Sequence, residues 1–212
     1  MKITLDFLES YHACKEGINW FTSQQDDDLM VIIRKLMEEE RFQWANWLIS
    51  NILDRQNVVR YAIFSAESVL DLFEKKYPDI KKPRLAIEAA KRCLDDTNHS
   101  DVYACAAHNA IYAASEDAYS CAADYAADAA AAAAHAAYIY AHDAACAAAD
   151  ADIAASDAAW AAYQTAYNAA GDTAYTYAVD AANAARKEMY KKVLNYGITL
   201  FTSQEQLKGE KL

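Results

Sequence analysis

The feature that most constrains the fold is a stretch from Ala104 to Ala185 in which 41 of the 82 residues are alanine. Alanine has the highest helix propensity of any residue, and the stretch contains one glycine and no proline. A single helix over residues 101–185 would be about 130 Å long, too long for one domain to contain. We therefore expect this stretch to fold back on itself as antiparallel helices joined by short turns.

The rest of the composition favours an all-α fold. The 212 residues include four glycines and two prolines, too few for the many turns that a β-rich fold of this size requires. We predict one all-helical domain over residues 1–212, either a multi-helix bundle or an array of helical hairpins. Ordinary amphipathic helices are expected in residues 1–100, tightly packed helices rich in Ala, Tyr and Asp in residues 101–196, and a short tail at residues 197–212.

We predict the individual helices from apolar residues spaced by three and four and from local stop signals. Helices are predicted over residues 6–21, 42–53, 58–77 and 83–94, with Ser23 as the cap of a further helix between the first two. Within the alanine-rich stretch, breaks are predicted at Ser115, at His142–Asp143 and at Asn168–Thr173. The last helix is expected to end near residue 196, which puts Arg186, Lys187, Lys191 and Lys192 at its C-terminal end, where the helix dipole favours cations.

Negative charge is concentrated in the middle of the chain. The formal net charge is −11, and residues 101–185 hold eleven acidic side chains but no lysine or arginine. Such a segment repels nucleic-acid phosphates and anionic lipid surfaces. We therefore expect no direct nucleic-acid contact and no membrane association, and a basic protein as the favoured partner.

Several of these carboxylates recur every seven residues, a step that returns a side chain to within about 20° on the same helix face. One interpretation is that the acidic row only keeps an alanine-rich helix in solution. A second is that it points outward and docks on a basic protein, and a third is that it holds a cation. The candidate partner-binding residues are Asp117, Asp124, Asp128, Asp143, Asp150 and Asp157.

The sequence offers little catalytic chemistry. It has no Gly-rich phosphate loop, no Gly-x-Ser-x-Gly motif and no Glu-x-x-His motif of the kind that builds a di-iron bundle. The pairs Cys105–His108 and His142–Cys146 each place two metal ligands on one helix face, but a zinc site needs three or four. We expect these residues to pack rather than to bind metal, and we predict no enzyme activity and no cofactor, with a Cys–His enzyme or metal site as an alternative.

Two arginines near the start of the helix at 58–77 are interpreted as structural. Arg55 and Arg60 are expected to pair with Glu67 or Asp71.

The five cysteines are odd in number, widely spaced and lack a Cys-x-x-Cys motif, which indicates free thiols in a reducing compartment. The N-terminus shows no targeting signal, so we expect a cytoplasmic protein.

Parts of the first half resemble a group of alanine-rich, all-helical immunity proteins of bacterial toxin systems, with relatives carried by phages. The segments that carry the resemblance are Trp47–Leu48, Val59–Glu67, Phe73–Pro78 and Pro83–Ala90. Ala13, Cys14, Gly17, Trp20 and Phe21 resemble the phage members. The likeness extends over about residues 13–186, although the alanine tract of the group often carries arginines and this one carries none.

The resemblance implies an inhibitor that acts by binding another protein, and it supplies no catalytic residues. Together with the charge, it leads us to expect a protein that neutralises a basic, nucleic-acid-acting target such as a nuclease, in a phage a bacterial defence factor. The outward carboxylates would then stand in for phosphates. The alternative is a structural scaffold that forms homo-oligomers through its alanine-rich helix faces.

Overall fold

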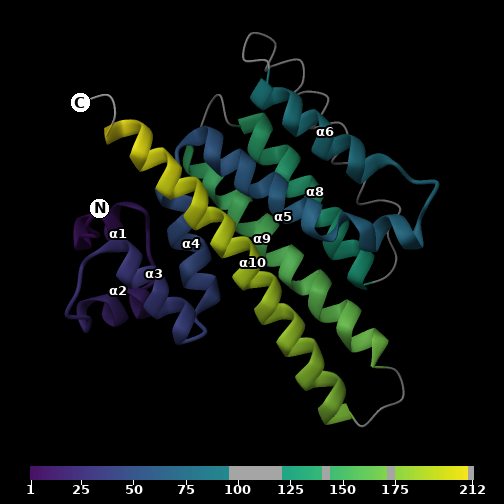
Figure 1. Cartoon of the computed structure of the whole chain (residues 1–212), viewed down its shortest axis with the longest axis horizontal. Coiled ribbons are helices and arrows are strands. Elements are labelled where there is room, and N and C mark those ends of the chain that lie inside the picture. Colours follow the sequence, from purple (N-terminus) through teal and green to yellow (C-terminus); the bar gives the residue numbers. More distant parts are fainter. Residues whose placement is uncertain (96–120, 140–143, 171–174, 210–212) are drawn as a thin grey trace.

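The computed structural model describes residues 1–95, 121–139, 144–170 and 175–209, and these ranges are helical throughout apart from short connections, which confirms the all-α prediction (Figure 1). The helices are α1 (Leu5–Ser10), α2 (Lys15–Thr22), α3 (Leu29–Glu38), α4 (Phe42–Ile52), α5 (Arg55–Lys76), α6 (Lys82–Asp95), α8 (Cys121–Ile139), α9 (Ala144–Ala169) and α10 (Tyr175–Gly209). None of the helices in these ranges is long and apolar enough to cross a bilayer.

The N-terminal segment contains two short helices where the apolar spacing predicted one over residues 6–21. The chain leaves the helical path after α1, and His12 adopts the left-handed conformation at φ 57°. Thr4 caps α1 and Cys14 caps α2, its Sγ accepting a hydrogen bond from the Gly17 amide at 3.3 Å. The apolar residues keep the predicted spacing, but the left-handed conformation at His12 and the new cap at Cys14 separate the two helices.

The cap predicted for the next helix is also wrong. Ser23 follows the end of α2, where its hydroxyl donates to the Trp20 carbonyl at 2.6 Å. Asp28 begins α3 instead, since its carboxylate accepts hydrogen bonds from the amides of Met30 and Val31. Asp is as good an N-cap as Ser, and Asp28 directly precedes the apolar residues of α3.

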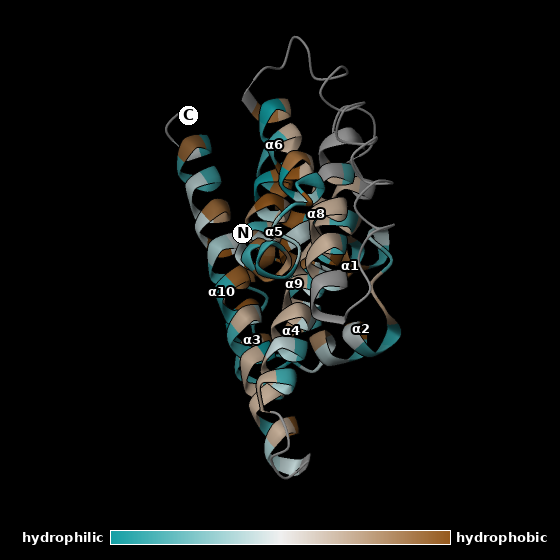
Figure 2. Cartoon of the chain, turned by 90° about the vertical axis from the view of Figure 1, so that its right-hand side faces the viewer, coloured by the Kyte–Doolittle hydropathy of each residue, from teal (hydrophilic) through white to brown (hydrophobic). Residues whose placement is uncertain are grey.

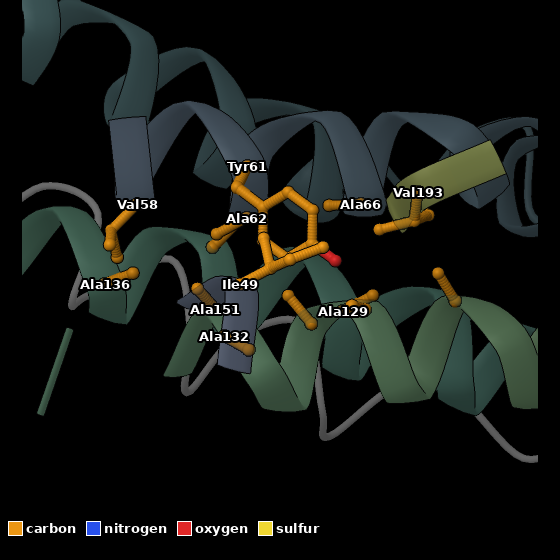
Figure 3. Close-up of a cluster of buried hydrophobic side chains, with 14 of the residues drawn as sticks. Ile49, Val58, Tyr61, Ala62, Ala66, Ala129, Ala132, Ala136, Ala151 and Val193 are labelled. Atoms are coloured by element: carbon orange, nitrogen blue, oxygen red, sulfur yellow. The ribbon is translucent and has the colours of Figure 1, made fainter. Parts of the chain in front are cut away.

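Helices α8 and α9 form the alanine-rich core, and α5 packs against both of them. Their contacting faces consist almost wholly of fully buried alanines, which let the backbones approach closely. From α5, Val58, Ala62 and Ala66 meet these faces around the buried ring of Tyr61 (Figure 3). The predicted tight packing of the alanine-rich helices is therefore confirmed.

The predicted turns of this region agree with the helix ends. Helix α8 ends at Ile139 and α9 begins at Ala144, around the predicted break at His142–Asp143. Helix α9 ends at Ala169 and α10 begins at Tyr175, around the predicted break at Asn168–Thr173. The break predicted at Ser115 lies outside the described residues.

The predicted tail is wrong, because α10 continues without interruption to Gly209. Its apolar face extends past residue 196, with Val193, Leu194 and Phe201 all buried. Gly197 does not end the helix; it lies where α10 packs directly against Ile49 of α4 and Tyr61 of α5. The cations at 186–192 consequently occupy the middle of α10 rather than its C-terminal end.

Near its end, α10 also closes the corner between α4 and α5. The buried amide of Gln204 accepts a hydrogen bond from the backbone N–H of Asp54 at 2.8 Å and donates to the carbonyl of Ile52 at 3.3 Å. The last turn of α4 and the first turn of α5 each leave backbone groups unpaired within their own helix. The Gln204 side chain of α10 therefore pairs with one backbone group at the end of α4 and one at the start of α5.

Candidate binding sites

The structure describes the side chains of only three of the six predicted partner-binding aspartates. Asp117 and Asp143 lie outside the described residues, and Asp124 lies on α8, with its side chain outside the described part of the structure. Asp128 is exposed on α8, whereas Asp150 and Asp157 on α9 are partly buried. The predicted outward row is therefore not present along α9.

Asp150 is held in an inward position by a histidine. One of its carboxylate oxygens lies 2.8 Å from Nδ1 of His135 on α8, and its side chain is only 14% exposed. Burial raises the pKa of Asp150, and the hydrogen bond to His135 opposes this effect. Because α9 is enclosed by α8, α5, α4 and α10, little of its surface remains for an acidic face.

Asp157 carries the clearest sign of an inward carboxylate. Burial raises its pKa from 3.8 to about 7, and the nearby Asp128 carboxylate acts in the same direction. A solvent-facing row that imitates phosphates needs ionised, exposed groups, and Asp157 is neither fully ionised at neutral pH nor exposed. The expected outward position is therefore wrong for Asp150 and Asp157, whereas Asp128 is exposed.

The inward position of Asp157 predicts a pH-dependent stability. Between about pH 4 and pH 7 the folded state holds a proton that the unfolded chain releases, so stability falls as the pH rises through this range. We expect Asp157→Asn, which imitates the protonated acid, to match the wild type at pH 4 and to be more stable by about 1–2 kcal/mol at pH 8 after allowance for solvent screening. Urea unfolding at the two pH values measures the difference.

The matched control is Asp180→Asn, which removes an exposed carboxylate from α10. It should leave the pH dependence of the wild type unchanged. A gain at pH 8 that is equal in both variants would show that overall charge, rather than burial of Asp157, sets the effect.

Sequence reasoning missed a buried polar cluster beside this row. Asn46 on α4 is 1% exposed, accepts a hydrogen bond from the hydroxyl of Tyr61 and donates through Nδ2 to both the carboxylate and the backbone carbonyl of Asp152, the latter at 3.0 Å. Burial raises the pKa of Asp152 to about 6, opposed by the hydrogen bond from Asn46. This cluster joins α4, α5 and α9, and we assign it a structural role.

The other sequence-predicted groups give no catalytic or metal site among the described residues. Cys105, His108 and His142 lie outside them, and Cys146 lies near the start of α9. The buried thiol of Cys93 has its pKa raised to about 11 by desolvation, which makes it a poor nucleophile. No group of three or more metal-ligating side chains comes together within the described ranges.

The expected ion pairs of two arginines are not formed. Arg60 donates to the side-chain oxygen of Asn57 at 3.0 Å, one turn away on α5. Glu67 pairs instead with Lys91 of α6. Lys91 reaches Glu67 because α6 packs against α5. The spacing of residues along the sequence does not predict this contact between helices.

Two pockets lie beside α4. The first, about 280 Å³, is mostly apolar and lies among α1–α4, lined by residues that include Leu8, Trp20, Trp44 and Trp47. The second, about 360 Å³, lies between the start of α4 and the middle of α10, where Arg41, Trp44, Arg186, Lys187 and Tyr190 line it. Three cations meet at this second pocket in a chain whose net charge is −11.

A hairpin made from the far half of α9 and the first turns of α10 projects beyond the other described helices (Figure 1). We call residues 161–170 and 175–182 the arm; in the perpendicular view its tip again lies past the bundle (Figure 2). Ala161, Ala178 and Ala182 are buried between its two helices. These three alanines are therefore used in contacts inside the chain.

Aromatic rings line the α9 side of the arm. Trp160, Tyr163 and Tyr167 form a continuous ladder, with ring centroids 5.3 and 6.3 Å apart. On α10, the side chain of Tyr177 is 66% exposed. Asp180 is the one charged residue of the arm, and it is acidic and exposed.

Comparison with known proteins gives one partial match. The family described as the YdhT N-terminal domain matches residues 1–56, which hold α1–α4 and the apolar pocket. No curated protein and no solved structure matches the chain. The matched residues make up about the N-terminal quarter of the chain.

Proposed function

We propose that this chain is a non-enzymatic binding protein of the inhibitor or immunity type, which neutralises a basic, nucleic-acid-acting protein in the cytoplasm. The observation that supports this proposal is the arm. This hairpin projects beyond the other described helices and carries the exposed ring of Tyr177, and Tyr and Trp are among the residues most enriched at protein–protein hot spots.

The chemistry of the arm favours a basic partner. Tyrosine faces attract lysine and arginine side chains, and the arm has no cation of its own to compete with them. Asp180 adds an exposed carboxylate. The net charge of −11 would speed encounter with a positively charged target over a distance, even though the aspartates of α9 face inward.

The first test identifies the partner and its chemistry. The full chain is used as bait in its native host. The captured protein is then purified and titrated with the purified chain, in the absence of other host proteins. We expect a 1:1 complex with a protein of pI above about 9, loss of that protein's activity on nucleic acid in the complex, and an affinity that falls at least about tenfold from 50 to 200 mM salt. An acidic partner, or a partner whose activity is unaffected, would overturn the proposal.

The second test locates the contact on the arm. Removing the exposed ring in Tyr177→Ala should weaken the complex by about tenfold or more, because the ring is available to the partner and makes few contacts within the chain. The control is Leu207→Ala, which removes a side chain 60% exposed near the other end of α10. Equal affinities of the two variants would place the contact elsewhere.

A further inference from the structure

We propose that the pocket between α4 and α10 binds a carboxylate carried on an apolar or aromatic body, with Arg186 as its anchor. This site is separate from the arm contact and does not depend on it. The proposal rests on the state of the Arg186 guanidinium, on the pairing of the charges around it and on the aromatic walls of the pocket.

Arg186 is oriented but lacks a polar partner. Its guanidinium carbon lies 4.3 Å from the ring centroid of Trp160 and 5.7 Å from that of Tyr190. Its Nε is buried without a hydrogen bond, and the side chain forms no ion pair with any residue that the structure describes. Arg186 also lines the pocket, so a ligand there would accept hydrogen bonds from the terminal nitrogens of a cation that has no charge partner among the described residues.

The other charges at the pocket are already neutralised. Arg41 lies 2.8 Å from a carboxylate oxygen of Glu39, and Lys187 lies 2.7 Å from one of Glu40. Among the described residues, Arg186 is thus the one cation of the pocket lining without an acidic partner. A ligand with a single negative charge balances the site.

The chemistry of this site selects a carboxylate over a phosphate. A guanidinium offers two parallel N–H donors that match the two oxygens of a carboxylate. Phosphate carries about one and a half to two charges at neutral pH, and the carboxylate of Glu40 in the pocket lining would repel the excess over one. The geometry of the charges therefore favours the monoanion.

The walls of the pocket suit an apolar body attached to that carboxylate. The ring of Phe42 stacks on that of Tyr190 with centroids 5.6 Å apart, and Trp44 lies on the same side beneath the guanidinium of Arg41. The cavity of about 360 Å³ is within the range of small-ligand sites. An aryl carboxylate, or an acidic group of a polypeptide with an apolar neighbour, has the matching shape and charge.

The experiment titrates the full-length chain with benzoate, with a short peptide ending in a free Phe carboxylate, with the same peptide amidated, and with inorganic phosphate. Tryptophan fluorescence reports binding, because Trp44 lines the pocket and Trp160 lies under Arg186. We expect saturable binding of benzoate or the free-acid peptide in the millimolar range or tighter, and about tenfold weaker binding or none for the amide and for phosphate.

Variants assign the binding to Arg186. Arg186→Gln should weaken carboxylate binding at least about tenfold, and Arg186→Lys should weaken it less, since it keeps the charge but loses the paired donors. Lys192→Gln removes an exposed cation from the same helix and should change the affinity less than twofold, within an additive error of about 0.5 kcal/mol. Thermal unfolding confirms that each variant is folded, and Arg186→Lys provides the test if Arg186→Gln is not.

Each outcome either tests the proposal or identifies the source of the ligand. Benzoate binding as tight as the peptide identifies a free small molecule, and a peptide at least about tenfold tighter identifies a polypeptide carboxylate. No saturable binding of either carboxylate, phosphate binding as tight as carboxylate, or equal affinities of Arg186→Gln and the wild type would each overturn the proposal.

Discussion

Replacing Asn46 with alanine is expected to lower the free energy of unfolding by about 2–4 kcal/mol, because the change leaves two buried groups without their partner. The Tyr61 hydroxyl donates to Asn46, and Asn46 donates to the Asp152 carboxylate. Without the amide, burial should raise the pKa of Asp152 further above its value of about 6. Chemical denaturation at neutral pH measures the loss.

The control for Asn46→Ala comes from the same helix. Asn51 also donates a side-chain hydrogen bond, but only to the Trp47 carbonyl of its own helix at 2.8 Å. Asn51→Ala should cost less than about 1 kcal/mol. The double variant of Asn46→Ala with Tyr61→Phe should be less destabilised than the sum of the single variants, by about 0.5–3 kcal/mol. Strict additivity would mean that the two side chains do not act together.

Replacing Gly197 with alanine is expected to destabilise the fold by about 2 kcal/mol, although alanine is the better helix former. A Cβ at this position would lie 2.5 Å from Cγ2 of Ile49 and 2.8 Å from Cε2 of Tyr61, both in the core. Overpacking of this kind costs about 1–3 kcal/mol or more, and the gain in helix propensity, about 1 kcal/mol, offsets only part of it. The expected fall in melting temperature is about 4–8 °C.

The matched control for this substitution is Gly209→Ala at the end of the same helix. No atom lies within 4 Å of a Cβ added there. That variant should be neutral or slightly more stable than the wild type. A Gly197→Ala protein as stable as Gly209→Ala would show that α10 does not approach α4 and α5 as closely as described.

The helical class and the turns of the alanine-rich region could be predicted because they depend on local signals. Alanine excludes strands, and the break that includes Gly171 lies between α9 and α10, as the sequence predicts. The break between α1 and α2 depends on the left-handed conformation of His12 and on the cap at Cys14, and the apolar spacing gives no sign of either.

The direction of the aspartates could not be predicted. The heptad step places Asp143, Asp150 and Asp157 on one face, but alanine suits buried and exposed positions equally, so the sequence does not say which face is outside. The neighbours that turn Asp150 and Asp152 inward, His135 and Asn46, come from other helices. Asn46 lies 106 residues from Asp152 in sequence.

The sequence predicts a helix end near residue 196, which would place Arg186 close to a helix C-terminus, where the dipole favours cations. Because α10 runs to Gly209, Arg186 lies mid-helix and faces the pocket beside the start of α4. Because the predicted end of the last helix is wrong, the sequence does not indicate that Arg186 lies at this pocket.

The contacts of Gln204 also set an order for the folding of this protein. While the chain is being made, residues 52–54 leave the ribosome about 150 residues before the side chain that will satisfy them. Contacts so distant in sequence form slowly, since a long loop must close first. We therefore expect α10 to dock late, after α4 and α5 have formed, with the corner between these two helices open to water until then.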